Sequence, residues 1–197
     1  MFTEKELRYI HDTDFLLTKG TVTEKVGGLL NQTHDLLKQY IASENFAFPA
    51  QTQARAGKIS RGENYQQLPY LLLDYPRKFT RQDVFALRTM FWWGQFFSVT
   101  FQLGGESWQR FRPTVQYNAG ELLTLPVSLC ISDDPWQHHR EPTYYQPVSE
   151  MSLEGMQRKL EQQPFLKLVT FLPLRDWKSL PDRALTFFRQ MAHLIEL

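Results

Sequence analysis

Apolar and polar residues alternate at helical spacing near the start of the chain. Between Val22 and Ile41, apolar side chains recur every three or four positions, as they do on one face of an α-helix. Gly20 precedes this stripe and suits a tight connection between two helices. We therefore expect helices at about 4–18 and 22–43, which form an antiparallel hairpin.

Helix starts are marked elsewhere by a hydroxyl residue followed three positions later by an acid, which is the spacing of a capping box. Four residues begin such a pattern: Thr3, Thr21, Thr80 and Ser179. Together with apolar periodicity, they predict further helices at about 81–93, 153–163 and 181–196. Gly27 and Gly28 interrupt the second helix at a cost of about 1 kcal/mol each relative to alanine. We expect close packing against a neighbouring helix to compensate.

Four segments have the pattern of β-strands. Apolar and polar residues alternate over 97–103 and 123–131, as in strands with one buried face. The runs 68–74 and 165–172 are almost continuously apolar, which is typical of strands covered on both faces. Pro126 places its strand at a sheet edge or beside a bulge.

These elements predict one α+β domain over residues 1–197. The helical hairpin of residues 1–44 is followed by a polar loop over 45–66. Residues 67–197 then supply the sheet and the remaining helices, including the C-terminal one. Half-polar strands favour an antiparallel or mixed sheet, here of about four to five strands. The alternation of strands and helices keeps an α/β arrangement as the alternative.

Composition excludes several classes of function. With 22 basic and 21 acidic residues, the net charge of +1 makes nucleic acid an unexpected partner. The single cysteine, Cys130, has no partner for a disulfide and is expected to be buried within a strand. No apolar run is long enough for a signal peptide or a membrane span, so we expect a soluble, cytoplasmic protein. No cofactor-binding glycine motif is present.

The segment 133–141 carries acids and two histidines and has the superficial composition of a metal site. However, Asp134 followed by Pro135 is a helix-start signature, which explains the acid without a metal. Adjacent histidines also point in different directions on a helix or strand. We therefore expect a helix start here and no metal.

Aromatic residues are concentrated around one unusual arginine. Of 28 aromatic residues, 13 lie between Tyr65 and Phe111. On the helix expected at 81–93, Arg88 would lie in the middle of the apolar face. A guanidinium cannot lose its charge on burial, so Arg88 needs an anionic partner. That partner is either an internal carboxylate, such as Asp74 or Glu63, or the carboxylate or phosphate of a ligand.

The segment 55–88 carries seven basic residues against three acidic ones. Our leading hypothesis is therefore a binding protein whose basic, aromatic-lined cleft receives a small anionic ligand. The expected ligand-binding residues are Arg61, Arg77, Arg88 and Trp92.

Two alternatives remain open from the sequence. In the first, the same cleft is the site of an enzyme, with Asp74 or Glu63 as general base and Tyr65 or Tyr75 as proton donor. In the second, these groups are paired with one another, and the chain is a structural or interaction protein without a small-molecule site. The sequence does not determine the oligomeric state.

Overall fold

In the computed structural model, which describes residues 1–197, seven strands form one sheet in the order β1-β2-β3-β4-β7-β5-β6. All neighbouring strands are antiparallel. The strands are β1 (Lys58–Tyr65), β2 (Leu68–Phe79), β3 (Asp83–Trp92), β4 (Phe96–Gly104), β5 (Ser128–Cys130), β6 (Tyr145–Pro147) and β7 (Phe165–Pro173). The α+β class is confirmed, the expected four to five strands are too few, and the α/β alternative is wrong.

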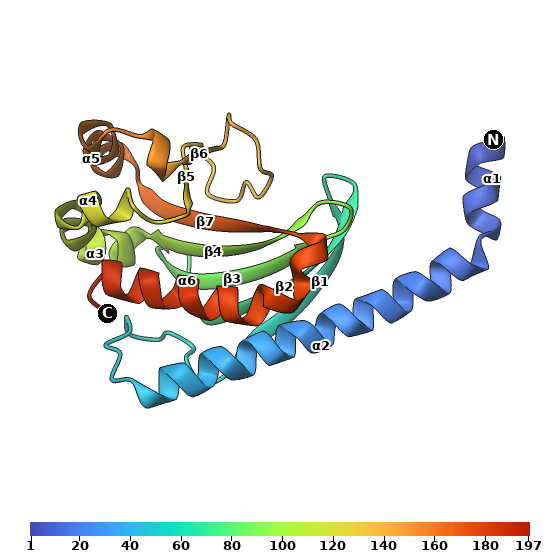
Figure 1. The fold of residues 1–197 in the computed structure, drawn as a ribbon, viewed down its shortest axis with the longest axis horizontal. Coiled ribbons are helices and arrows are strands. Elements are labelled where there is room, and N and C mark those ends of the chain that lie inside the picture. The colour runs from blue at the N-terminus through green and yellow to red at the C-terminus, as the bar shows by residue number, and fades with distance from the viewer.

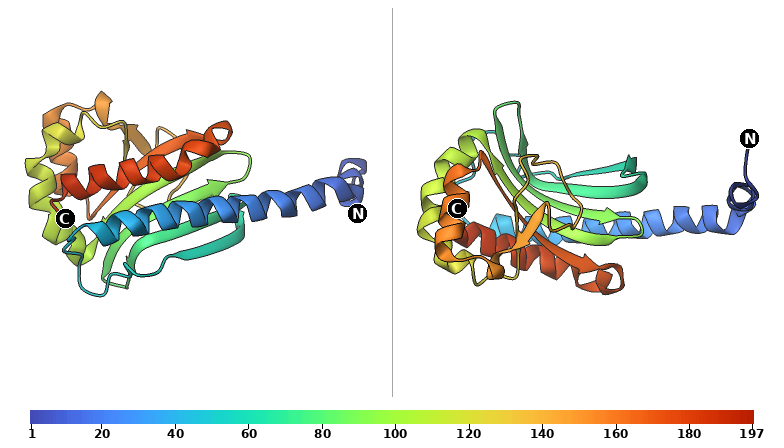
Figure 2. Two further views of the ribbon diagram at one scale, coloured as in Figure 1. Left: turned by 60° about the horizontal axis from the view of Figure 1, so that its bottom comes forward. Right: turned by 90° about the horizontal axis from the view of Figure 1, so that it is seen from above.

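Two helices, α2 (Thr13–Ser43) and α6 (Leu180–Leu194), lie side by side over one face of the sheet (Figures 1 and 2). The helices α3 (Gly105–Tyr117), α4 (Ala119–Leu122) and α5 (Leu153–Gln162) gather at one end of the strands. Two short 3₁₀ helices, η1 (Val148–Glu150) and η2 (Leu174–Ser179), complete the body. The opposite face of the sheet contacts the loop of residues 131–144, here called the anchored loop.

The main core lies between the sheet and the helices α2 and α6. Leu30 and Leu37 of α2, Phe187 of α6, and Phe85 and Phe101 of the sheet are at most 1 % exposed. This cluster contains 35 buried apolar residues, so most of the hydrophobic stabilisation comes from this face. No helix is both long enough and apolar enough to cross a membrane.

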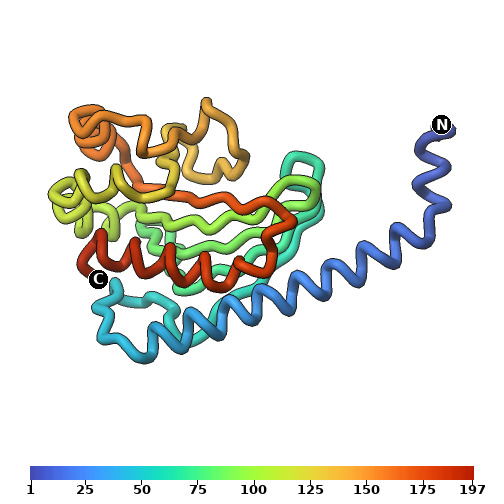
Figure 3. Tube along the Cα trace, in the orientation of Figure 1, coloured from blue at the N-terminus to red at the C-terminus, as the bar shows by residue number.

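The N-terminal hairpin expected over 1–44 is wrong. A short helix, α1 (Glu4–His11), ends at Asp12, and α2 then continues without a break through Gly20 (Figure 3). The capping box at Thr3 is confirmed, whereas Thr21 lies inside α2 and its hydroxyl donates to the Leu17 carbonyl. Glycines weaken a helix by about 1 kcal/mol each, less than the burial of the apolar stripe on α2 contributes.

The expected packing against Gly27 and Gly28 is also wrong. No atom lies within 4 Å of the place where a Cβ would stand on either residue. Both glycines therefore face open space.

The helix expected at 81–93 is wrong, because this segment is strand β3. Its side chains alternate between the main core, which receives Phe85 and Leu87, and the opposite face, which receives Met90. The signature at Thr80 belongs to a hairpin turn, where the hydroxyl accepts the backbone N–H of Asp83 at 2.9 Å. Burial on both faces removes the two-residue alternation that distinguishes a strand.

Three further boundaries differ from expectation. Strand β1 lies inside the segment 45–66 expected to be a loop, because an edge strand can be polar on both faces. The expected strand 123–131 is reduced to β5, and α3 and α4 precede it. Asp134 starts no helix; its carboxylate instead caps a turn, accepting from the backbone N–H of Trp136 at 2.9 Å.

Two smaller expectations are also wrong. Ser179 provides no side-chain cap for α6, and its hydroxyl instead donates to the Asp176 carbonyl at 2.8 Å. Pro126 precedes β5, which lies between β7 and β6 and not at the sheet edge.

Several other elements are confirmed. Strands β2, β4 and β7 contain the segments 68–74, 97–103 and 165–172, and α5 and α6 match the two expected C-terminal helices. The thiol of Cys130 is fully buried.

Candidate functional site

Arg88 pairs with Asp74 across strands β2 and β3, where the two residues are directly opposite. The Arg88 Nε and Nη2 donate to the two carboxylate oxygens at 2.7 and 3.0 Å. This two-pronged geometry is the strong form of an arginine–carboxylate pair. The internal partner expected for Arg88 is therefore present, and of the two acids considered it is Asp74.

The anchored loop is held to the sheet by hydrogen bonds from several strands. The Tyr65 hydroxyl accepts the backbone N–H of His138 at 2.7 Å, and Lys167 Nζ donates to the carbonyl of Pro135 at 2.8 Å and to that of Gln137. The Tyr145 hydroxyl donates to the Gln137 carbonyl at 2.6 Å. Because β1, β6 and β7 each contribute a side chain, the middle of the loop, residues 135–138, is fastened to the sheet.

Burial sets the charge state of this polar cluster. Burial, with the nearby cations Lys167 and Arg88, lowers the pKa of His138 well below its usual value. Burial likewise lowers the pKa of Lys167 to about 7 and raises the pKa of Tyr65. His138 is therefore neutral at pH 7, and its Nε2 lies 3.4 Å from Arg88 Nη1 as an acceptor.

Other candidate residues lie away from this cluster. Arg61 is opposite Leu71, a residue of the main core, so its side chain is on the face covered by α2. Glu63 pairs with Lys19 of α2 at 3.0 Å. The Tyr75 hydroxyl donates to the Ala54 carbonyl at 2.8 Å. The structure therefore does not bring Arg61, Glu63 or Tyr75 together with Arg88.

Two candidates do share a face with Arg88. Arg77 is opposite Ala86 on β3, two residues from Arg88, and its buried Nε has no hydrogen-bond partner. Trp92 packs edge-on against Tyr65, with ring centres 5.1 Å apart. It also lines a polar pocket of about 240 Å³ together with His139 and Arg140.

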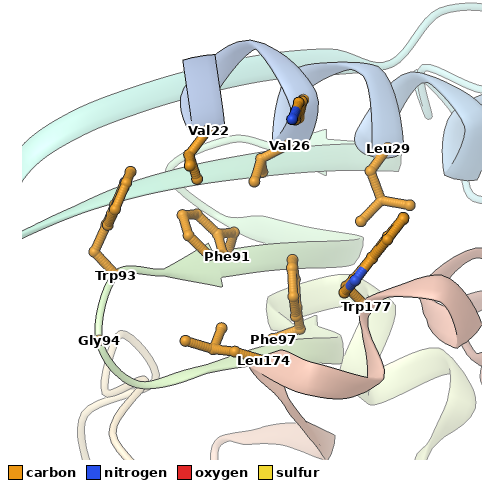
Figure 4. Close-up of a pocket in the computed structure, with 10 residues that line it drawn as sticks. Val22, Val26, Leu29, Phe91, Trp93, Gly94, Phe97, Leu174 and Trp177 are labelled. Carbon is orange, nitrogen blue, oxygen red and sulfur yellow. The ribbon is translucent and has the colours of Figure 1, made fainter. Parts of the chain in front are cut away.

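A strongly apolar cavity lies elsewhere, where α2 leaves the body (Figure 4). This groove has a volume of about 330 Å³ between α2, the β3–β4 hairpin and η2. Its lining is Val22, Lys25, Val26, Leu29, Phe91, Trp93, Gly94, Phe97, Leu174 and Trp177. Trp177 is 48 % exposed, and the buried Nε1 of Trp93 has no partner.

Residues 1–18, here called the arm, project from the body beyond the groove (Figures 1 and 2). No side chain of the arm is buried. Of the thirteen large apolar side chains that remain exposed in the whole chain, seven lie in the arm: Met1, Phe2, Tyr9, Ile10, Phe15, Leu16 and Leu17. The arm is thus the main exposed apolar segment of the molecule.

The apolar stripe of α2 continues from the body onto the arm. Phe15 lies seven residues before Val22 and so within about 20° of it around the helix axis. Leu16 and Leu17 follow at steps of about 100°, so the three side chains face different sides. The hairpin expected from the sequence would have buried these residues, which is why the sequence did not indicate the arm, although its apolar run was visible.

Comparisons with family models, with curated proteins and with solved structures found no match to this chain. The candidate site therefore depends on geometry and chemistry alone.

Proposed function

We propose that this chain is an interaction protein that binds a protein partner through the arm and the groove. The observation that supports this proposal best is the concentration of exposed apolar side chains on the arm. Exposed apolar surface that is concentrated in one segment is typical of interaction sites. A helix that is apolar on several sides is ordinarily buried.

The energetics of the arm support a partner. Helix α1 has eight residues and no buried side chain, and isolated helices shorter than about 12–15 residues are marginal in water. Full burial of one Leu or Phe side chain stabilises by about 1.5–3 kcal/mol. A partner that covers only Phe15, Leu16 and Leu17 would therefore contribute this burial free energy for each of the three side chains.

The pairing of Arg88 favours this function over the expected ligand cleft. Asp74 already satisfies the guanidinium of Arg88, and Arg61 lies on the other face of the sheet. Both carboxylates considered as general base are likewise paired, Asp74 with Arg88 and Glu63 with Lys19. The interaction alternative requires no further partner for these groups.

A small anionic ligand remains a second candidate, favoured by the polar pocket beside Trp92. Arg140 contributes a cation to its lining, and Trp92 and Phe96 provide aromatic walls. A thermal-shift titration with phosphate and citrate tests this candidate. A melting shift that Arg140→Gln abolishes would support it, and no shift at 100 times a plausible dissociation constant would contradict it.

The leading proposal is tested by site-specific photocrosslinking in cells that make the protein. A benzophenone analogue of phenylalanine replaces Phe15 in the arm or, as a control, Tyr117, which is 88 % exposed on α3. We expect a protein adduct of discrete mass from position 15 and none from position 117. Absence of an adduct at position 15, or equal adducts at both positions, would overturn the proposal.

A further inference from the structure

The arm and the groove lie on the same helix, one directly after the other. Val22, Val26 and Leu29 of α2 form one wall of the groove, and Phe15 extends the same stripe outward. One surface thus carries both a projecting apolar segment and an apolar recess. A surface that contacts its own copy across a two-fold axis must be self-complementary in this way.

Two charged side chains on the groove side of α2 are also self-complementary across a two-fold axis. Asp14 and Lys25 are eleven residues apart, about three helical turns, and within about 20° of each other around the axis. Lys25 lines the groove. Neither side chain makes an ion pair within the chain. An acid and a base at the two ends of one stripe match an identical stripe that runs in the opposite direction.

We propose that the partner is a second copy of this chain, with the two α2 helices antiparallel and the arm of each copy covering the groove of the other. The proposal rests on the proposed function and names its partner. Asp14 of each copy lies opposite Lys25 of the other, which forms two equivalent ion pairs. Phe15 then lies beside Val26 of the other copy, within its groove.

The residues at the centre of this pair permit close approach. The midpoint between positions 14 and 25 falls at residues 19 and 20, and the nearest positions on the groove side are Thr18 and Val22. Their short side chains suit the usual separation of about 8–10 Å between packed helices. In this arrangement Thr18 of one copy lies opposite Val22 of the other.

The exposed apolar area is of the size that a stable dimer needs. The seven exposed apolar side chains of the arm offer at most about 700 Å² per copy, or about 1,400 Å² from both arms, against about 1,200–2,000 Å² for stable interfaces. Because Phe15, Leu16 and Leu17 face different sides of the helix, burial of this whole area requires contacts with the body of the other copy as well as with its α2. The groove, with the half-exposed Trp177, adds to this area.

A charge exchange tests the arrangement in the full-length protein. Asp14→Lys and Lys25→Glu each place like charges opposite each other twice, so each should weaken the dimer by about tenfold or more. The double variant restores opposite charges and should return the dissociation constant to within about threefold of the original. Lys38→Glu changes an exposed lysine on another side of α2 and should leave the dimer unchanged.

The measurement is sedimentation velocity over a concentration series, with circular dichroism to verify that each variant is folded. A monomer at all concentrations overturns the second copy as partner, and so does a dimer that the single variants leave intact or that the double variant fails to restore. If the protein is monomeric but position 15 still crosslinks to a different protein in cells, only this inference fails. If no adduct forms at position 15, the proposed function fails as well.

Discussion

Arg88→Met tests whether the Asp74–Arg88 pair holds the polar face of the sheet together. The substitution keeps a side chain of similar length but leaves the Asp74 carboxylate, which is 8 % exposed, without its cation. Removing one partner of a buried pair costs about 3–5 kcal/mol. Because the Arg88 side chain is 16 % exposed, water can reach the vacated position. We therefore expect a loss near the lower end, about 3 kcal/mol.

The assay is urea unfolding followed by tryptophan fluorescence and circular dichroism, with the m-value compared between variants. Arg61→Met is the matched control, because it removes an exposed arginine and should change the free energy of unfolding by less than about 0.5 kcal/mol. Asp74→Leu combined with Arg88→Met removes both charges. This double variant should recover most of the loss, since apolar side chains can replace a buried ion pair at little cost.

Two results would refute this reasoning. A loss of less than about 1 kcal/mol in the free energy of unfolding of Arg88→Met would mean that the buried Asp74 carboxylate does not need Arg88 as its counter-ion. A double variant less stable than Arg88→Met would mean that Asp74 has favourable contacts apart from the pair. The first result would also remove the pairing of Arg88 as an argument against a ligand cleft, and the support from the exposed arm would remain.

Three further substitutions test other features of the fold. The pKa of His138 is well below 6.5 in the folded chain and near 6.5 in the unfolded chain, so the unfolded chain binds the proton more readily. The free energy of unfolding should therefore fall as the pH decreases below 6.5. His138→Gln should flatten this dependence in unfolding curves recorded at and below pH 6.5. Gly105 has a φ of +57° and no room for a Cβ beside the Gln82 carbonyl. Gly105→Ala should therefore lower the free energy of unfolding by about 2 kcal/mol or more. Thermal melting measures this loss against the control Gly120→Ala, whose added Cβ meets open space. Gly27→Ala should stabilise by about 0.5–1 kcal/mol in the same assay, and destabilisation would show that the position is not open.

The sequence predicted those elements whose polar and apolar residues fall on separate faces. Strand β4 alternates in sequence because Ser98, Thr100 and Gln102 are polar, although they are buried as well, and the helices α5 and α6 carry clear apolar stripes. Strand β3 lacks this alternation, because its second face carries mainly apolar side chains such as Met90 and Trp92. A continuously apolar segment fits a helix as well as a strand.

The candidate site was predicted in part, and partly for the wrong reason. Asp74 was identified as a partner of Arg88 because a buried guanidinium needs an anion, and the pair exists. However, that argument assumed that Arg88 lies on a helix, whereas it lies on strand β3. The contacts of His138 and Lys167 depend on the path of the anchored loop, which local sequence does not determine.

The arm was missed because a glycine was given too much weight. Gly20 appeared to end one helix and begin another, yet α2 passes through it. An isolated glycine lowers helix stability by only about 1 kcal/mol. The length of a helix is decided by the apolar stripe that packs on the body.

Both outermost strands of the sheet resist further strand addition. Strand β1 carries Lys58, Arg61 and Glu63 at exposed positions, and a register shift interrupts its pairing after Gly62. At the other end, β6 has only three residues. Charged or very short margins discourage the edge-to-edge stacking that leads to filaments. Association of this molecule is therefore directed to side chains on helices, where a symmetric contact closes on itself and growth stops at a finite assembly.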